Sequence, residues 1–235
     1  MSERIRSLLF AGLLSLVCSV LLTAASTGLQ DLQQHNMHIE KNRNILKAVG
    51  LIDTGKILSE SDIERIYDQN IRTFWVTPEG DLVDALKRKD ADLALYVRLD
   101  NQKIQNYAVP VESRGLWGKI YGYLALESDG ATIAGFTVFK HTETPGLGGE
   151  IEKEWFQRNW IGKKIINKEG AFVSVSIVRG AAKDAVSDER LPHYVDGISG
   201  ATLTGRYLSA GIRQTLESYE PVSIRFRKHM ISSVK

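Results

Sequence analysis

An uncharged apolar segment near the amino end is the feature that most limits what this chain can fold into. No charged residue occurs from Ser7 to Gln30, and the apolar part runs from Leu8 to Ala25. At about 1.5 Å of rise per residue, a helix of this length can cross the hydrocarbon core of a bilayer. A secretory signal has a shorter apolar region, of about 7–15 residues. We therefore expect a retained anchor over residues 1–28, with a cleaved signal ending near "TAAST" as the alternative.

The charges around this segment indicate which side of the membrane holds the rest of the chain. Arg4 and Arg6 precede it, and the next basic residue is Lys41. By the positive-inside rule, the short amino end stays in the cytoplasm and the bulk of the chain is exported. An anchor and a cleaved signal give the same compartment. Cys18 lies within the span, where we interpret it as a small apolar residue in lipid.

Charge and metal-ligand content exclude several functions. The formal net charge of +2 is too small to indicate a nucleic-acid partner, and basic and acidic residues are interspersed. A single cysteine excludes an internal disulfide and an iron–sulfur cluster held by cysteines of this chain alone. The five histidines do not have the spacing of a zinc motif. We expect no metal site.

Apolar periodicity predicts helices at both ends of the exported part. The predicted helices cover residues 29–50, 59–71 and 202–219, and a polar, helical connector covers 81–92. Ser59 or Ser61 would cap the second helix. The last helix would bury an apolar stripe, formed by Leu208, Ile212, Leu216 and Tyr219.

The pattern between these helices is mainly β. Residues 119–128 and 131–141 flank Asp129-Gly130, which predicts a hairpin with a type I′ turn. Strands are also predicted over residues 93–99 and 171–178, and residues 221–235 are compatible with a last strand. A helix is predicted over residues 150–165, with Trp155, Phe156 and Trp160 packed on one face. The fold class is α+β: a single domain on a helical stalk and one membrane anchor.

Two glycine-rich stretches are the candidates for chemistry. The first, "HTETPGLGGEIE" (141–152), follows a predicted strand. It is either a plain strand-to-helix turn or a loop whose bare backbone packs on a planar ligand. The second, "DGISGATLTG" (196–205), precedes the last helix. Ser199 or Thr202 would cap that helix.

The start of the last helix has a second interpretation. Free amides and the positive end of the helix dipole favour phosphate, so a hydroxyl there could hold a phosphate by hydrogen bonds or by a covalent ester. The chain has no Walker A motif and no G-x-G-x-x-G opening a βαβ unit. We therefore expect neither nucleotide hydrolysis nor an NADH site here.

Asp196-Gly197-x-Ser199-Gly200-Ala201-Thr202 resembles the motif at which bacterial flavoprotein subunits join FMN to threonine through a phosphodiester bond. The motif is accompanied by "GLWG" (115–118), "ETPGLGGEIE" (143–152) and the tryptophan pair before "GKK" (162–164). Their order is similar to the C subunit of the Na⁺-translocating NADH:quinone reductases and, less closely, to the G subunit of Rnf complexes. The resemblance covers about 109–219 and implies an FMN-binding domain over 109–235. Residues 29–108 would be the stalk and the first part of the periplasmic domain.

The resemblance implies roles for particular residues. Thr202 stands in the acceptor position for covalent FMN, and no residue of this chain would act as a catalytic acid or base. Gly205 departs from the family, which more often has serine there. Basic candidates for the phosphate or the reduced flavin are Lys163, Lys164, Arg179 and Arg206. The remaining site residues are Asp196, Ser199, Gly200 and Ala201 around the acceptor, and Glu143, Thr144, Gly146, Leu147 and Gly148 lining the flavin.

The resemblance also implies a setting. The chain would carry electrons through FMN in a six-subunit NADH:quinone (ubiquinone) reductase of the bacterial inner membrane, with NADH bound by another subunit. A separate flavin transferase would attach the FMN. Ion transport would belong to partner subunits, because one apolar span without buried charge offers no ion path. Three alternatives are the equivalent Rnf subunit, an anchored covalent-FMN accessory or sensor protein, and a structural domain in which "SGAT" only caps a helix.

Overall fold

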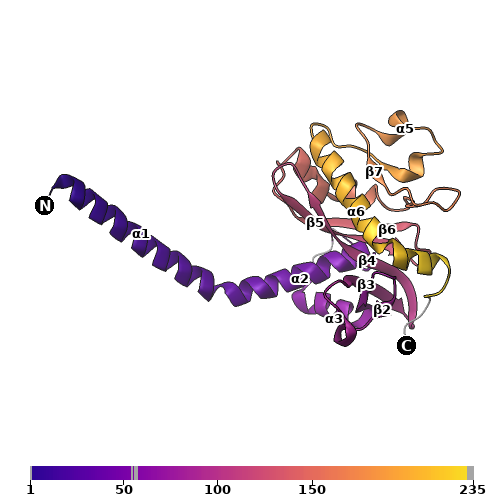
Figure 1. Ribbon diagram of the computed structural model, residues 1–235, viewed down its shortest axis with the longest axis horizontal. Helices are drawn as coiled ribbons and strands as arrows, with labels where there is room; N and C mark the ends of the chain where they lie inside the picture. The colour runs from indigo at the N-terminus through magenta and orange to yellow at the C-terminus, as the bar shows by residue number, and fades with distance from the viewer. Residues whose placement is uncertain (1, 54, 56–57, 232–235) are drawn as a thin grey trace. The chain divides into compact units, whose positions relative to one another are not determined.

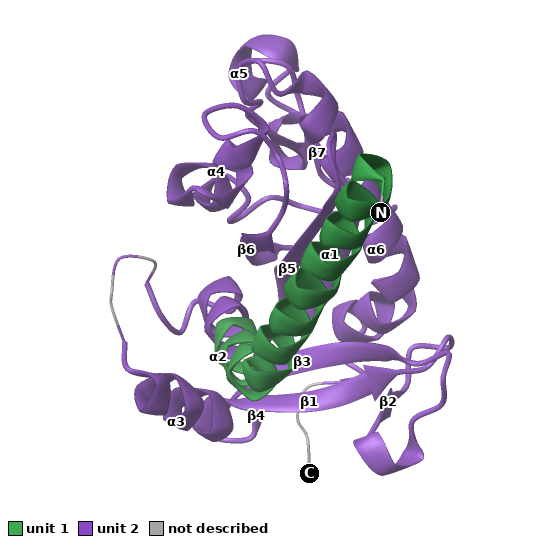
Figure 2. Cartoon of the chain, turned by 90° about the vertical axis from the view of Figure 1, so that its left-hand side faces the viewer, with its two compact units in different colours: residues 1–41 green, residues 42–235 purple. Residues whose placement is uncertain are grey.

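A computed structural model describes residues 2–231 except 54 and 56–57. The chain divides into two compact units, residues 1–41 and 42–235 (Figure 2). The first unit holds helix α1 (Glu3–Gly28) and the first part of α2 (Gln30–Ala48). Among the described residues, α1 is the one helix long and apolar enough to cross a membrane. It is therefore compatible with the expected single-pass anchor.

The second unit begins with the end of α2, which is fixed to a sheet. Ile45, Leu46 and Ala48 are buried there. The carbonyl of Val49 accepts hydrogen bonds from Arg98 Nη1 at 2.9 Å and from Asn106 Nδ2 at 3.1 Å. The predicted helix over 29–50 is confirmed. Helix α3 (Glu60–Asn70) confirms the prediction for 59–71, and its cap is Ser59, whose Oγ accepts from the Asp62 amide.

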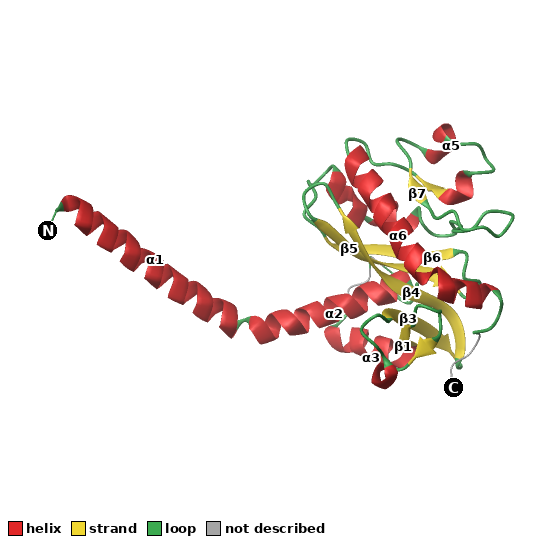
Figure 3. Cartoon of the chain, in the orientation of Figure 1, coloured by secondary structure: helices red, strands yellow, loops and turns green. Residues whose placement is uncertain are grey.

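A six-stranded antiparallel sheet, whose strands are yellow in Figure 3, forms the centre of this unit. Its strand order is β2-β1-β3-β4-β5-β6. The predicted strand at 93–99 and the predicted hairpin are confirmed. Strand β4 is continuous across residues 108 and 109, where the sequence predicts the start of the FMN-binding domain. The sheet therefore includes residues on both sides of that predicted boundary. The strands are β1 (Ile71–Val76), β2 (Leu82–Val83), β3 (Leu93–Asp100), β4 (Lys103–Arg114), β5 (Lys119–Glu127) and β6 (Ile133–Lys140).

Two local predictions in this sheet are wrong. The connector at 81–92 is not a helix: it holds the short strand β2 and a single 3₁₀ turn, η1 (Ala85–Lys87). The Asp129-Gly130 turn is not type I′, because only Gly130 has a positive φ. Instead Asp129 Oδ1 accepts from the amides of Ala131 and Thr132, which gives a longer loop. The type I′ conformation occurs in the β3–β4 hairpin, where Asn101 and Gln102 both have positive φ.

Helix α6 (Thr202–Arg227) packs along β4 (Figure 1). Gly211 lies so close to Ser113 that a Cβ there would come within 2.3 Å of Ser113 Oγ. The predicted stripe of Leu208, Ile212, Leu216 and Tyr219 is buried. The helix then continues through Pro221 to Arg227. The possible strand over 221–235 is therefore wrong for the described residues of that segment. The reason is that Val222 and Phe226 extend the same buried stripe.

The segment between β6 and α6 contains only short elements. The predicted helix over 150–165 is wrong: after α4 (Glu154–Arg158), Gly162 and Lys163 form backbone hydrogen bonds with Ile133. Trp155 is exposed, whereas Phe156 and Trp160 are buried. The predicted strand over 171–178 is also wrong in extent, because Ser174 has φ +65°. The other elements are η2 (Gly148–Glu152), β7 (Ser176–Ile177), α5 (Ala182–Ala185), η3 (Leu191–His193) and β8 (Tyr194–Val195), with β7 and β8 parallel.

Candidate functional site

Three loops that are far apart in sequence meet near the amino end of α6. The first is "GLWG" (115–118), which joins β4 to β5. The second is residues 141–149, which follow β6, and the third is residues 196–201, which precede α6. All three are stretches that the sequence marks as candidates.

The buried carboxylate of Glu143 connects these loops. Its Oε1 accepts from the backbone amides of Leu116, at 2.8 Å, and Trp117, at 3.1 Å. Its Oε2 accepts a short hydrogen bond from the hydroxyl of Thr204, in the first turn of α6. Glu143 and Thr204 are only 5% and 2% exposed. A Cβ at Gly148 would lie within 2.7 Å of both oxygen atoms of this hydrogen bond, so only glycine fits without displacing it.

A second contact joins the Leu147 loop to the turn before α6. A Cβ on Gly200, which has φ +74°, would come within 2.7 Å of Leu147 Cδ2. The Leu147 loop is held by the carbonyl of Thr144, which accepts from the amides of Leu147 and Gly149. Gly146 supplies a positive φ at the exposed tip. The structure thus brings Leu147 and Gly148 next to Gly200 and Thr204.

The start of α6 differs from both capping predictions. Ala201 is the N-cap, and no side chain caps the helix, so the prediction of a cap by Ser199 or Thr202 is wrong. Ser199 and Thr202 are exposed, and Thr202 is the first helical residue. Its hydroxyl is therefore not used for a cap. Asp196 has a different role, because its Oδ1 accepts from the amide of Ala182 at 2.7 Å and so holds the start of α5.

A cavity of about 250 Å³ lies beside Thr202. Arg179 and Arg206 line it together with β7 and the first turns of α6. Gly205 forms part of its wall and packs on Ile177, where an added Cβ would be 3.2 Å from Cγ2. A serine at this position would therefore require Ile177 to move slightly.

The other two basic candidates are engaged elsewhere. Lys163 Nζ donates to the carbonyl of Leu191 at 3.0 Å, and burial lowers the pKa of this lysine. Lys164 contacts Thr132 and Asp129 at the β5–β6 loop. Of the four basic candidates, only Arg179 and Arg206 line the cavity beside Thr202.

Exposed apolar side chains surround the same loops. Leu116, Trp117, Leu147 and Leu203 are 42–69% exposed. Sequence reasoning missed the roles of Leu116, Trp117, Leu203 and Thr204. The signal for the first three was their place within the two flanking motifs. Thr204 also lies within the 196–205 stretch, but its bond to Glu143 had no local signal, because that partner is 61 residues away in sequence.

This arrangement fits a ligand with an anionic group and a flat apolar part. The helix end and two arginines suit a phosphate. The exposed leucines and Trp117 suit an aromatic ring, and the tight glycines let it approach the backbone. Within the described residues, no cluster of three metal-ligating side chains occurs. Residues 115–217 match the FMN-binding domain family, so this part of the chain is classed as a flavin-binding domain.

Comparison with known proteins narrows this class. The chain is 32% identical to the C subunit of the Na⁺-translocating NADH-quinone reductase of Vibrio alginolyticus, over 87% of this chain and 85% of that protein. It is 33% identical to the C subunit of the Yersinia pestis reductase, over 85% and 83%. The chain belongs to the family of C subunits of Na⁺-translocating NADH-quinone reductases, and is therefore part of an oxidoreductase complex.

A solved structure agrees with this assignment. The crystal structure of the C subunit from Parabacteroides distasonis matches with a TM-score of 0.69 and 30% identity, over 83% of this chain and 96% of that one. NqrC from Shewanella oneidensis matches with a TM-score of 0.62 and 26% identity, over 81% and 96%. These relatives are all C subunits of this reductase, so the alternative of an Rnf protein is not favoured.

Proposed function

We propose that this chain carries FMN on Thr202 through a phosphodiester bond and passes electrons within a Na⁺-translocating NADH-quinone reductase. The observation that carries the proposal is the position of Thr202. Its side chain is exposed, it begins α6, and it lines the cavity that Arg179 and Arg206 also line. A hydroxyl in this place is free to form an ester without losing a helix cap.

The surroundings of Thr202 support binding of the phosphate. The first amides of a helix have no acceptor within the helix, and the dipole is positive at this end. Arg179 and Arg206 would add two further positive charges. These groups would hold the phosphate but would not take part in electron transfer.

The apolar side chains around Glu143 support binding of the ring. Leu147 and Leu203 would contact the isoalloxazine, with Leu116 and Trp117 from the neighbouring loop. Bound FMN would supply the electron-transfer chemistry. The protein's part is to hold the ring in place and exclude water from it. Glu143 would act indirectly, by holding the three loops at fixed positions.

A covalent bond suits the expected location. The proposed arrangement has α1 in the inner membrane, residues 42–235 in the periplasm and the other subunits as partners. We expect no pool of FMN outside the inner membrane, so a flavin that dissociated would be lost. As the family resemblance implies, a separate flavin transferase would attach the FMN from FAD.

The test is the intact mass of the full-length chain after co-expression with a flavin transferase. We expect wild type to carry one FMN and to fluoresce after denaturing electrophoresis. Thr202→Ala should lose both signals. Thr202→Ser is the matched control: it keeps a hydroxyl, and we expect it to carry FMN on part of the protein. Flavin on Thr202→Ala would show that the attachment site is wrong, and a flavin-free wild type would overturn the proposal.

A further inference from the structure

Strand β4 is paired on both sides over only half of its length. Its pairing with β5 continues to Arg114↔Lys119. Its pairing with β3 ends at Tyr96↔Ala108. In the part of the chain that the structure describes, no strand pairs with the β3 side of residues 109–114. This half of β4 is therefore an open sheet edge.

Pro110 explains why the pairing with β3 stops. The Gly115 amide donates to the Gly118 carbonyl, so odd-numbered residues of β4 point their amides toward β5. Even-numbered residues point theirs toward the open side. Pro110, the next even position after Ala108, has no amide hydrogen to continue the ladder. The carbonyl of Ala94, which such an amide would have reached, accepts instead from the Tyr219 hydroxyl at 2.6 Å.

Two backbone amides beyond Pro110 consequently face the open side. They belong to Glu112 and Arg114. The Glu112 side chain pairs with Lys119 of β5, whereas the Arg114 guanidinium reaches across to the Tyr207 ring of α6. The amides of Glu112 and Arg114 are donors on this edge and the carbonyls of Pro110 and Glu112 are acceptors, while the Arg114 carbonyl accepts from Ser113 Oγ at 3.0 Å. A strand edge with such groups is a template for pairing with another strand.

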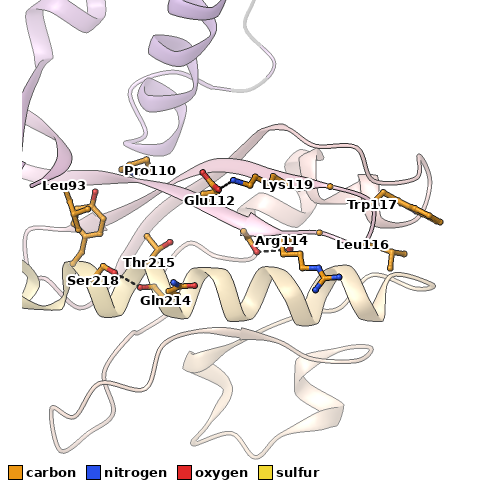
Figure 4. A pocket seen from close by; sticks show the side chains of 14 residues that line it. Leu93, Pro110, Glu112, Arg114, Leu116, Trp117, Lys119, Gln214, Thr215 and Ser218 are labelled. Atoms are coloured by element: carbon orange, nitrogen blue, oxygen red, sulfur yellow. Dashed lines mark hydrogen bonds and ion pairs between the residues drawn. The ribbon is translucent and has the colours of Figure 1, made fainter. Parts of the chain in front are cut away.

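A groove of about 800 Å³ runs along this edge. β4 forms one side and α6 the other, through Gln214, Thr215 and Ser218 (Figure 4). Leu93 lies at one end, and Leu116 and Trp117 lie at the other end. The second end is the loop that Glu143 holds at the proposed flavin site.

We propose that an extended segment of another protein of the reductase complex adds to β4 at Pro110–Arg114 as a further strand. The pattern of backbone groups specifies the chemistry of the occupant, because a ladder is completed only by another polypeptide. Family membership supplies the partner class, since the C subunit belongs to a complex of several subunits. A second copy of this chain fits less well. In each copy α6 borders the open edge of β4, so the two α6 helices would keep the β4 edges of two copies apart. The added strand would end beside Leu116 and Trp117.

This inference rests on membership of the reductase family and not on the attachment of flavin to Thr202. The two are therefore tested separately. A chain without covalent flavin can still have its β4 edge protected, and a chain with covalent flavin can have its edge free.

The test is hydrogen–deuterium exchange at single amides, comparing the full-length chain alone with the assembled complex in the same detergent. We expect the amides of Glu112 and Arg114 to exchange at least about tenfold more slowly in the complex, which corresponds to one hydrogen bond of ordinary strength. The amides of Val111 and Ser113 already pair with β5, so they are the internal reference. Equal exchange of Glu112 and Arg114 in both samples would overturn the proposal.

A pair of variants provides an independent measurement. Glu112→Pro removes one edge amide, as Pro110 does naturally, and leaves the β4–β5 bonds intact. Glu112→Ala removes the same side chain but keeps the amide. We expect Glu112→Pro to dissociate from the complex about tenfold faster on dilution, by the loss of one such hydrogen bond, and Glu112→Ala to behave as wild type. If Glu112→Pro unfolds at a much lower temperature than Glu112→Ala, its faster dissociation could come from unfolding. The hydrogen–deuterium exchange of the wild-type chain then decides whether the β4 edge is paired.

Self-association of the chain through the β4 edge would also contradict the proposed partner. Sedimentation of the isolated chain over a range of concentrations would detect it. A dimer that protects the amides of Glu112 and Arg114 would identify a second copy as the occupant and overturn the proposed partner. A monomer with both amides exposed is the expected result.

Discussion

The hydroxyl of Thr204 donates a hydrogen bond to Oε2 of Glu143, although the two residues are 61 positions apart. The other oxygen of the same carboxylate accepts from the amides of Leu116 and Trp117. One buried side chain therefore sets the relative positions of α6, the β4–β5 loop and the loop after β6. Because these elements carry the exposed apolar groups and Thr202, the geometry of the site depends on this carboxylate.

Replacing Glu143 should destabilise the domain and separate the loops. Glu143→Ala leaves the amides of Leu116 and Trp117 and one buried hydroxyl without their acceptor, and we expect a loss of about 2–3 kcal/mol in the free energy of unfolding. Glu143→Gln keeps one acceptor oxygen, so the loss should be about 1 kcal/mol. Urea unfolding of the flavin-free protein measures both values.

Glu169→Ala is the control, because Glu169 is an exposed carboxylate distant in sequence from these loops. It should change the free energy by less than about 0.5 kcal/mol. If Glu143→Ala is as stable as this control, the carboxylate does not hold the loops together.

The two glycines at 146 and 148 should respond differently to alanine. At Gly148 an added methyl meets the Thr204 hydroxyl and Glu143 Oε2, within 2.7 Å of each. We expect Gly148→Ala to cost about 1–3 kcal/mol, as overpacking does, and to reduce flavin attachment. Gly146 has open space around it, and only its φ of +74° resists alanine. Gly146→Ala should cost about 1 kcal/mol and leave attachment unchanged.

Unfolding curves and intact masses of both variants check this order. A Gly146→Ala variant that loses more flavin than Gly148→Ala would contradict it. That result would mean that the loop tip, and not the contact with Glu143, positions the flavin.

Local patterns in the sequence predicted much of this structure. The apolar helix α1, the β5–β6 hairpin and the buried stripe of α6 each follow from residues close together in the chain. The three motif stretches could be located for the same reason. Their connection through Glu143 could not, because neither Glu143 nor Thr204 carries a local sign of its partner.

Two of the wrong predictions have a physical cause in tertiary contacts. The predicted last helix ends at Tyr219, but burial of Val222 and Phe226 continues it to Arg227. The alternating residues of 171–178 suggested a strand, but Ser174 adopts a positive φ and only β7 remains. In both cases contacts with distant residues outweigh the local preference.

Acid should destabilise the β5–β6 loop through Asp129. Burial raises the pKa of this carboxyl, but hydrogen bonds from Thr132 and Ala131 and the charge of Lys164 outweigh it and lower the pKa overall. A lowered folded pKa means that the carboxylate contributes stability above its unfolded pKa of about 3.9, and that this contribution is lost as the pH falls through the folded pKa.

The measurement compares wild type with Asp129→Asn, by urea unfolding between about pH 6 and pH 3, a range that spans the unfolded pKa. We expect Asp129→Asn to be less stable at the upper end and to lose less stability than wild type on acidification. Parallel curves for the two proteins would show that Asp129 gains nothing from its hydrogen bonds.

Substitutions of the two threonines at the start of α6 should have different effects: one should lower stability and the other should prevent flavin attachment. Thr204 is buried and bonded to Glu143, so Thr204→Val removes a buried hydrogen bond with little change in shape. We expect it to lower the free energy of unfolding by about 1–2 kcal/mol while FMN is still attached. Thr202 is exposed and caps nothing, so Thr202→Val should keep wild-type stability and lose the flavin.

Intact mass and urea unfolding of the same two preparations separate these effects. Thr204→Ser is the control for the first variant, because it restores the donor to Glu143 and should recover most of the stability. The opposite pattern, with flavin retained on Thr202→Val and absent from Thr204→Val, would move the attachment to the buried threonine. It would also require the Glu143 contact to open before FMN could reach that hydroxyl.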